Sequence, residues 1–214
     1  GVRYSTTTSF SDGADDYFTR TDGFSQASGI PSYTEFGGSW FWAAEDIDST
    51  DNPDGLALLD FTGINISAFD SVTLSLDLGA GSNAVFDSTD DFVLVQYRVD
   101  AGAWSTALAF QNDGESFNSG LYQDIDLDGI GEGALVDLSL ETFTSATLPA
   151  VGSLMDIRID TLMTSGSEAV AFDNLQVTGV PEPATSALIL ALITGVLLLF
   201  KQPFLPQRKN ESRA

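Results

Sequence analysis

Residues 71–78 read Ser-Val-Thr-Leu-Ser-Leu-Asp-Leu, with an apolar side chain at every second position. Successive side chains of a β-strand point to opposite faces, so this period of two predicts a strand that buries one face and exposes the other. The face expected to be buried carries Val72, Leu74, Leu76 and Leu78.

The same alternation recurs along residues 1–179, between short Gly, Asp, Asn and Ser clusters that are typical of turns. In residues 154–161, for example, Met155, Ile157 and Ile159 alternate with charged residues. Short strands without intervening helices predict an all-β fold, a two-sheet antiparallel β-sandwich of jelly-roll-like form. The predicted strands are 6–10, 39–44, 56–61, 71–78, 92–99, 104–110, 135–143, 154–161 and 169–177.

The composition excludes several classes of function. The chain has 214 residues, 31 acidic and 8 basic, with no histidine and no cysteine, and its formal charge is −23. Without Cys or His there is no disulfide framework, thiol nucleophile or Ser-His pair, and no zinc site of the usual kind. Nucleic acid is not expected as a partner, because binding phosphates requires Lys and Arg. With 43% hydrophobic residues the chain can still build a core.

The basic residues are unevenly distributed. Residues 181–214 contain four basic and two acidic side chains, which leaves a charge of −25 and no lysine upstream. Residues 184–200 carry no charge, so we expect a short transmembrane helix there, followed by a basic cytoplasmic tail at 201–214. A buried core helix is the alternative, but it would show a polar face, and this run has only one serine and two threonines.

Immediately before this run, residues 180–183 form a linker that contains Pro181, Glu182 and Pro183. A Pro-Glu-Pro motif, an apolar span and a basic end resemble the PEP-CTERM sorting signal of Gram-negative bacteria. The resemblance implies export through the inner membrane, processing by an exosortase-type protease, and a location in the cell envelope or the extracellular polysaccharide. Export also requires an N-terminal signal peptide, which we expect to have been removed from, or omitted in, this chain.

Carboxylates are most concentrated in residues 124–132, Asp-Ile-Asp-Leu-Asp-Gly-Ile-Gly-Glu. Acids at the first, third and fifth positions, followed by glycine, can turn several oxygens toward one hard cation. We expect Asp124, Asp126, Asp128 and Glu132 to bind a structural Ca²⁺. A solvated acidic turn is the alternative, because the twelfth position is Leu135, where an EF-hand has a bidentate glutamate.

Asp173 is a second candidate metal ligand. In the predicted last strand it falls on the same face as Ala171, Leu175 and Val177, and an unpaired carboxylate in an apolar register is costly. Its expected companions follow the strand at 39–44, and they are Glu45, Asp46 and Asp48. Alternatively, Asp173 caps a bulge. The Ala-Phe-Asp-Asn segment 171–174 resembles calcium-stabilised jelly-roll modules of the carbohydrate-binding type, which implies a structural ion at Asp173.

Three tryptophans could stack on sugar rings, namely Trp40, Trp42 and Trp104, although large aromatic residues also fill inter-sheet cores. Catalysis is not expected, because residues 1–179 have no lysine for Schiff-base or Ser-Lys chemistry. The sequence therefore predicts an exported, non-enzymatic surface protein with a calcium-stabilised β-sandwich. A carbohydrate-binding module is the alternative, and a carboxylate-dependent glycosidase is a further one.

Overall fold

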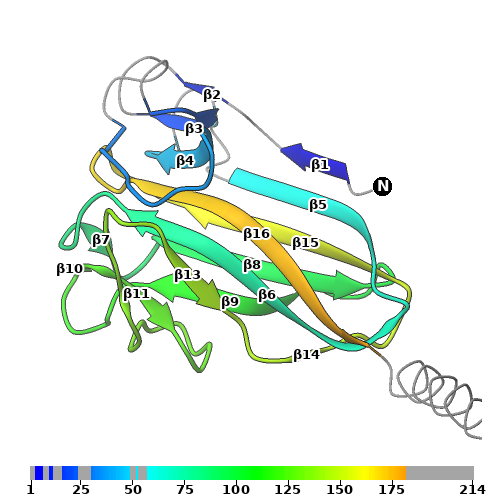
Figure 1. Ribbon diagram of the computed structural model, residues 1–214. Helices are drawn as coiled ribbons and strands as arrows, with labels where there is room; N and C mark the ends of the chain where they lie inside the picture. The colour runs from blue at the N-terminus through cyan, green and yellow to red at the C-terminus, as the bar shows by residue number, and fades with distance from the viewer. Residues whose placement is uncertain are drawn as a thin grey trace, which may run out of the picture. The chain divides into compact units, whose positions relative to one another are not determined.

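The computed structural model describes residues 3–6, 10–11, 16–23, 30–48, 52 and 57–181 (Figure 1). Contacts divide the chain into Gly1–Val180 and Pro181–Ala214. Within the described ranges, no helix has the length and apolar character needed to cross a bilayer. The predicted membrane span 184–200, the tail 201–214, and Glu182 and Pro183 of the sorting motif lie outside these ranges.

The described residues of the first unit are all-β, as predicted, and form mainly two seven-stranded sheets. The first sheet has the order β1-β5-β15-β8-β9-β11-β12, and its neighbouring strands pair antiparallel. Its strands are β1 (Arg3–Thr6), β5 (Ala57–Asn65), β15 (Leu154–Leu162), β8 (Phe92–Val99), β9 (Ser105–Gln111), β11 (Leu121–Asp124) and β12 (Leu135–Val136).

The second sheet has the order β13-β6-β16-β4-β3-β2, with β14 also paired to β6. Its strands are β13 (Glu141–Thr144), β6 (Phe69–Ala80), β16 (Val170–Pro181), β4 (Phe41–Glu45), β3 (Tyr17–Thr21), β2 (Phe10–Ser11) and β14 (Leu148–Pro149). A separate pair joins β7 (Phe86–Asp87) and β10 (Asn118–Ser119). β16 continues through Val180 and Pro181, the first residues of the predicted linker.

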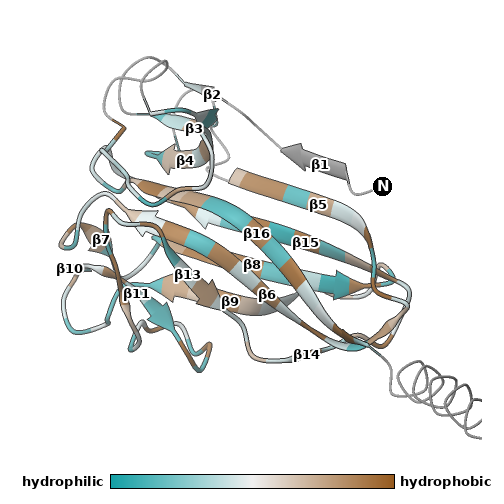
Figure 2. Cartoon of the chain, viewed as in Figure 1, coloured by the Kyte–Doolittle hydropathy of each residue, from teal (hydrophilic) through white to brown (hydrophobic). Residues whose placement is uncertain are grey.

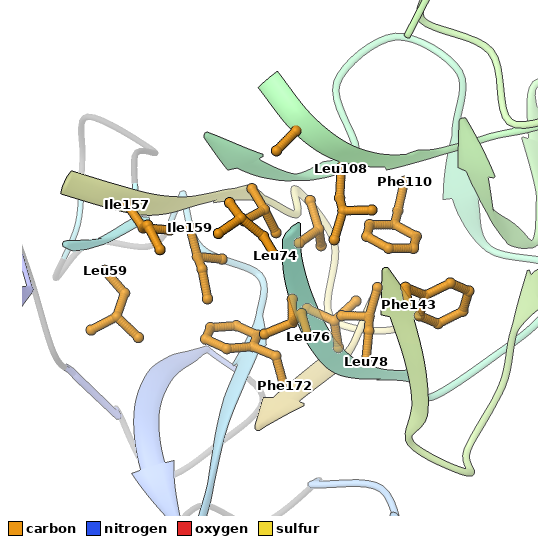
Figure 3. Packing of buried hydrophobic residues seen from close by; sticks show 14 of the residues in the cluster. Leu59, Leu74, Leu76, Leu78, Leu108, Phe110, Phe143, Ile157, Ile159 and Phe172 are labelled. Atoms are coloured by element: carbon orange, nitrogen blue, oxygen red, sulfur yellow. The ribbon is translucent and has the colours of Figure 1, made fainter. Parts of the chain in front are cut away.

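The alternating residues that predicted the strands build the core. In β6 the apolar face is buried, and Val72, Leu74, Leu76 and Leu78 are at most 1% exposed. Met155, Ile157 and Ile159 of β15 are also buried, as expected. Hydrophobic and hydrophilic positions alternate along these strands in Figure 2, and the buried side chains of the two sheets face one another in Figure 3. The period-two pattern therefore predicted the buried faces correctly.

The single strand predicted at 135–143 is wrong. The structure divides it into β12 and β13, which belong to different sheets. Between them, the side chain of Asp137 accepts a hydrogen bond from the Ser139 amide at 2.8 Å. Asp137 also accepts one at its carbonyl from the Ala80 amide. An aspartate that bonds an amide two residues ahead forms a turn, which here interrupts the apolar run.

The prediction that Ala171, Leu175 and Val177 lie on one face of β16 is also wrong, because a one-residue irregularity lies in the middle of the strand. Ala171 packs in a second buried cluster with Tyr17, Tyr33 and Phe41, whereas Leu175 packs against the main core. Residues four apart in a regular strand would share a face. Asn174, with φ of 49°, lies between them, and Asn is one of the few residues that tolerate this left-handed conformation. β16 thus changes its facing at a bulge-like position.

Candidate functional site

A pocket of about 220 Å³ is lined by residues of both sheets. Four apolar side chains, each 1% exposed, line it, and we call them the floor: Leu59, Leu76, Ile159 and Phe172. They come from β5, β6, β15 and β16. In Figure 3, Leu59 and Ile159 of the first sheet lie across from Leu76 and Phe172 of the second. The pocket therefore reaches the inter-sheet core.

Aromatic side chains line the pocket above the floor. Trp42 and Phe61 are half-buried, and the ring centroid of Trp42 lies 5.2 Å from that of Phe18. Trp40 is 40% exposed, and the Arg20 guanidinium carbon lies 5.3 Å from its ring centroid, within cation–π distance. The predicted pair Trp40 and Trp42 therefore meets at one pocket, where Trp42 contributes to the core and Trp40 stays accessible.

Asp173 also lines the pocket, where it anchors the segment before Trp40. Its Oδ2 accepts a hydrogen bond from the Gly37 amide at 2.8 Å. The Asn174 amide group donates to Asp77 Oδ2 at 2.7 Å. A Cβ on Gly37 would lie 2.6 Å from Asn174 Nδ2, so any larger residue there would displace the Asn174 side chain. The bulge in β16 thus holds the segment that carries Trp40.

The structure does not bring Asp173 together with Glu45, Asp46 and Asp48. Antiparallel pairing sets Phe172 opposite Trp42 and Val170 opposite Ala44, so Glu45 lies near the start of β16 and Asp173 further along it. Four residues along a strand amount to roughly 13 Å. The sequence placed these acids correctly at the end of β4, but it did not show the register of β4 on β16.

Asp46 lies with Asp48 and Asp16 instead. Burial comes first among the causes that raise the pKa of Asp46 to about 7. The protonated Asp46 carboxyl can also donate hydrogen bonds to the side chains of Asp48 and Asp16, whose negative charges act in the same direction. Glu45 is 5% exposed, and burial followed by the charge of Glu45 raises the pKa of the Tyr33 hydroxyl well above its usual value. Asp46 therefore favours its protonated form, and none of these acids lines the pocket.

The acidic loop does bring its predicted members together. Asp124, Asp126, Asp128 and Glu132 each offer an oxygen within 4.8 Å of the others. Partial desolvation and the neighbouring charges of Asp128 and Glu132 raise the pKa of Asp126, which is the effect of crowded like charges. Oxygen ligands of this type suit Ca²⁺.

Some of these carboxylate oxygens already accept hydrogen bonds from backbone amides. Asp124 is 2% exposed, and its carboxylate accepts hydrogen bonds from the amides of Leu127, Asp128 and Gly129 at 2.6, 3.2 and 2.9 Å. Glu132 Oε1 accepts one from the Ile125 amide at 2.7 Å. The loop is therefore closed by its own hydrogen bonds, and a cation would share these oxygens with backbone donors.

Sequence reasoning missed a second acidic cluster, formed by Asp87, Asp91 and Glu168, whose oxygens also lie within 4.8 Å of one another. Asp91 and Glu168 are each 4% exposed, and both accept hydrogen bonds from the Thr164 amide. Burial raises the pKa of Asp91 to about 6 and that of Glu168 to about 8, the latter with a contribution from Asp91. The run Asp-Ser-Thr-Asp-Asp at 87–91 was a visible concentration of acids in the sequence. Glu168 could not be assigned to it, because it is distant in sequence.

Trp104 does not line the pocket. The guanidinium carbons of Arg98 and Arg158 lie 4.6 and 4.5 Å from its ring centroid. These arginines pair with Asp156 and Asp60 respectively, at 2.9 and 2.7 Å. Trp104 therefore belongs to a charged network on β5, β15 and β8, and the predicted set of three stacking tryptophans reduces to two at the pocket.

No protein-family model and no curated protein matches this sequence. Among solved structures, a cyclase from Fischerella sp. TAU in complex with 4-(1H-indol-3-yl)butan-2-one is 15% identical, with 83% of this chain and 85% of that chain covered and a TM-score of 0.48. TmCBM61 in complex with β-1,4-galactotriose is 6% identical, with 84% and 88% covered and a TM-score of 0.44. Similarities of this degree carry no argument about ligand or activity.

Proposed function

We propose that the β-sandwich is a non-enzymatic carbohydrate-binding module of jelly-roll type, displayed outside the cell. The carrying observation is the pocket, which combines aromatic rings with a few polar groups, namely Arg20, Asp173 and Asn174. Apolar lining with a small number of polar groups is the usual composition of a small-molecule site. The jelly-roll assignment is supported by β5 and β6, and by β15 and β16, which are consecutive strands in opposite sheets.

The pocket lining argues against glycoside hydrolysis there. Two carboxyl groups about 5–10 Å apart are needed to cleave a glycosidic bond. Among the described residues that line the pocket, Asp173 is the only acid, and one of its oxygens already binds the Gly37 amide. A binding role requires no second carboxylate.

Titration calorimetry on the full chain, guided by a glycan array, tests the proposal. Trp40→Ala is expected to weaken sugar binding several-fold, because contacts with an aromatic ring contribute on the order of 0.5–1.5 kcal/mol. Trp104→Ala is the matched control and should bind as the wild type does, since Trp104 lies outside the pocket. Silence on the array, or equal losses in the two variants, would refute the assignment.

Export rests on the sequence of the C-terminal segment, in which Pro181, Glu182 and Pro183 precede an apolar run and a basic end. In this proposal an exosortase-type protease processes the tail after the membrane helix at 184–200 has halted translocation. A reporter fused to residues 178–214 should leave the cytoplasm of an exosortase-bearing host. Retention in the cytoplasm would refute the sorting role and leave the sugar-binding proposal standing.

Calcium at the acidic loop is part of the same proposal. Its support is the convergence of Asp124, Asp126, Asp128 and Glu132. An ion held there would fix the β11–β12 connection and neutralise charge in a strongly acidic body.

A further inference from the structure

The pocket between the sheets is polar at its mouth and apolar at its base. Arg20 and Asn174 are exposed, Asp173 is half-buried, and the four floor residues are 1% exposed. Arg20 has no ion-pair partner among the residues that the structure describes, whereas Arg98 and Arg158 each pair with an aspartate. Hydrogen-bonding groups are thus available at the mouth.

The floor side chains Leu59, Leu76, Ile159 and Phe172 have no polar atom to offer a ligand. Their strands are paired within the sheets, so backbone groups at the floor are largely committed to ladder hydrogen bonds. A sugar hydroxyl that pointed at the floor would lose its water without gaining a partner, which weakens binding about fivefold to 150-fold. An ordinary hexose, with hydroxyls around its whole ring, therefore fits this pocket poorly.

We propose that the pocket selects a sugar residue that presents a methyl group, such as carbon 6 of a 6-deoxyhexose or the terminal methyl of the acetamido group of an N-acetylhexosamine. The methyl group lies on the floor, the ring packs against Trp42 and Phe61, and the polar groups of the sugar meet Arg20 and Asp173 at the mouth. The inference rests on the proposed sugar-binding function and specifies its ligand.

The volume of the pocket limits how much of a glycan it holds. Sites for drug-sized ligands measure roughly 300–1,000 Å³, whereas this pocket measures about 220 Å³. It therefore accepts a single sugar residue, and the rest of a glycan extends past Trp40 into solvent. A pocket of this size therefore predicts that the protein recognises a terminal or side-branch sugar of a glycan.

Matched sugar pairs test the preference with the unaltered full chain. L-Rhamnose is compared with L-mannose, and L-fucose with L-galactose, because each pair differs only at carbon 6. N-acetyl-D-glucosamine is compared with D-glucose. At least one substituted sugar is expected to bind ten times or more tightly than its parent, since burying a methyl group alone strengthens binding about fourfold and an unpaired hydroxyl weakens the parent further.

The outcomes separate the two proposals. If no glycan binds, on the array or in solution, the sugar-binding function fails and the inference fails with it. If sugars bind but in every pair the parent binds as tightly as its substituted partner, only the inference is overturned.

A variant with a larger side chain in the pocket tests whether the preference for the substituted sugar arises there. Leu175→Phe places a larger side chain on the pocket lining, and it should abolish the difference between the two members of a pair. Leu154→Phe is the control, because Leu154 is 47% exposed and does not line the pocket. Circular dichroism checks that both variants fold. A folded Leu175→Phe protein that keeps the full preference would refute binding at the floor.

Discussion

The buried pair Asp91 and Glu168 should make the protein less stable as pH rises from about 4 to 8. Both folded-state pKa values are raised, to about 6 and about 8, from ordinary values of 3.8 and 4.5, with burial as the main cause. The folded protein therefore holds protons that the unfolded chain releases, so stability is complete below pH 4 and is lost as pH rises through 6 and 8.

Glu168→Gln should remove the loss of stability that accompanies ionisation of this buried pair at high pH. Each pKa unit corresponds to about 1.4 kcal/mol, and because the two carboxyl groups titrate together we count one shared proton. The variant should then be more stable than the wild type by about 2–4 kcal/mol at pH 8.5 and nearly equal to it at pH 5. The glutamine can still accept the Thr164 amide hydrogen bond that Glu168 accepts at 2.9 Å.

Urea unfolding of the full chain at pH 5 and pH 8.5, with EDTA present, measures this difference. Glu115→Gln is the matched control, since Glu115 is exposed and outside the cluster. The reasoning is refuted if Glu168→Gln shows no gain at pH 8.5, or if Glu115→Gln shows the same gain.

Three further predictions follow from individual contacts. Gly37→Ala should weaken sugar binding several-fold and destabilise the protein by about 1–3 kcal/mol, because its Cβ would meet Asn174 Nδ2 at 2.6 Å. The double variant Gly37→Ala with Asn174→Gly should recover stability, and urea unfolding that shows no recovery would contradict this contact. EDTA should lower the melting temperature of calcium-loaded protein, with a loss of about 2.7 kcal/mol from a calcium concentration of 100 Kd. Combined Asp126→Asn and Asp128→Asn substitutions should abolish that shift, and no EDTA effect in the wild type would exclude the site. Leu76→Ala should cost about 2–5 kcal/mol in urea unfolding, since Leu76 is 1% exposed in the main core; a smaller loss would show that the pocket already relieves packing there.

Local patterns in the sequence were enough for the all-β fold and for the buried faces of β6 and β15. Alternation at Val72, Leu74 and Leu76 depends only on the strand geometry of a few consecutive residues. The convergence of Asp124, Asp126, Asp128 and Glu132 was equally local, because all four belong to one short loop.

Contacts between distant residues could not be derived in this way. The meeting of Glu168 with Asp87 and Asp91, the register of β4 on β16, and the bulge at Asn174 each depend on how separate strands pair. The pocket is the clearest case, since Leu59, Trp42 and Asp173 lie on three strands of two sheets. Hydrophobic periodicity states which side chains are buried, whereas pairing and packing decide which of them become neighbours.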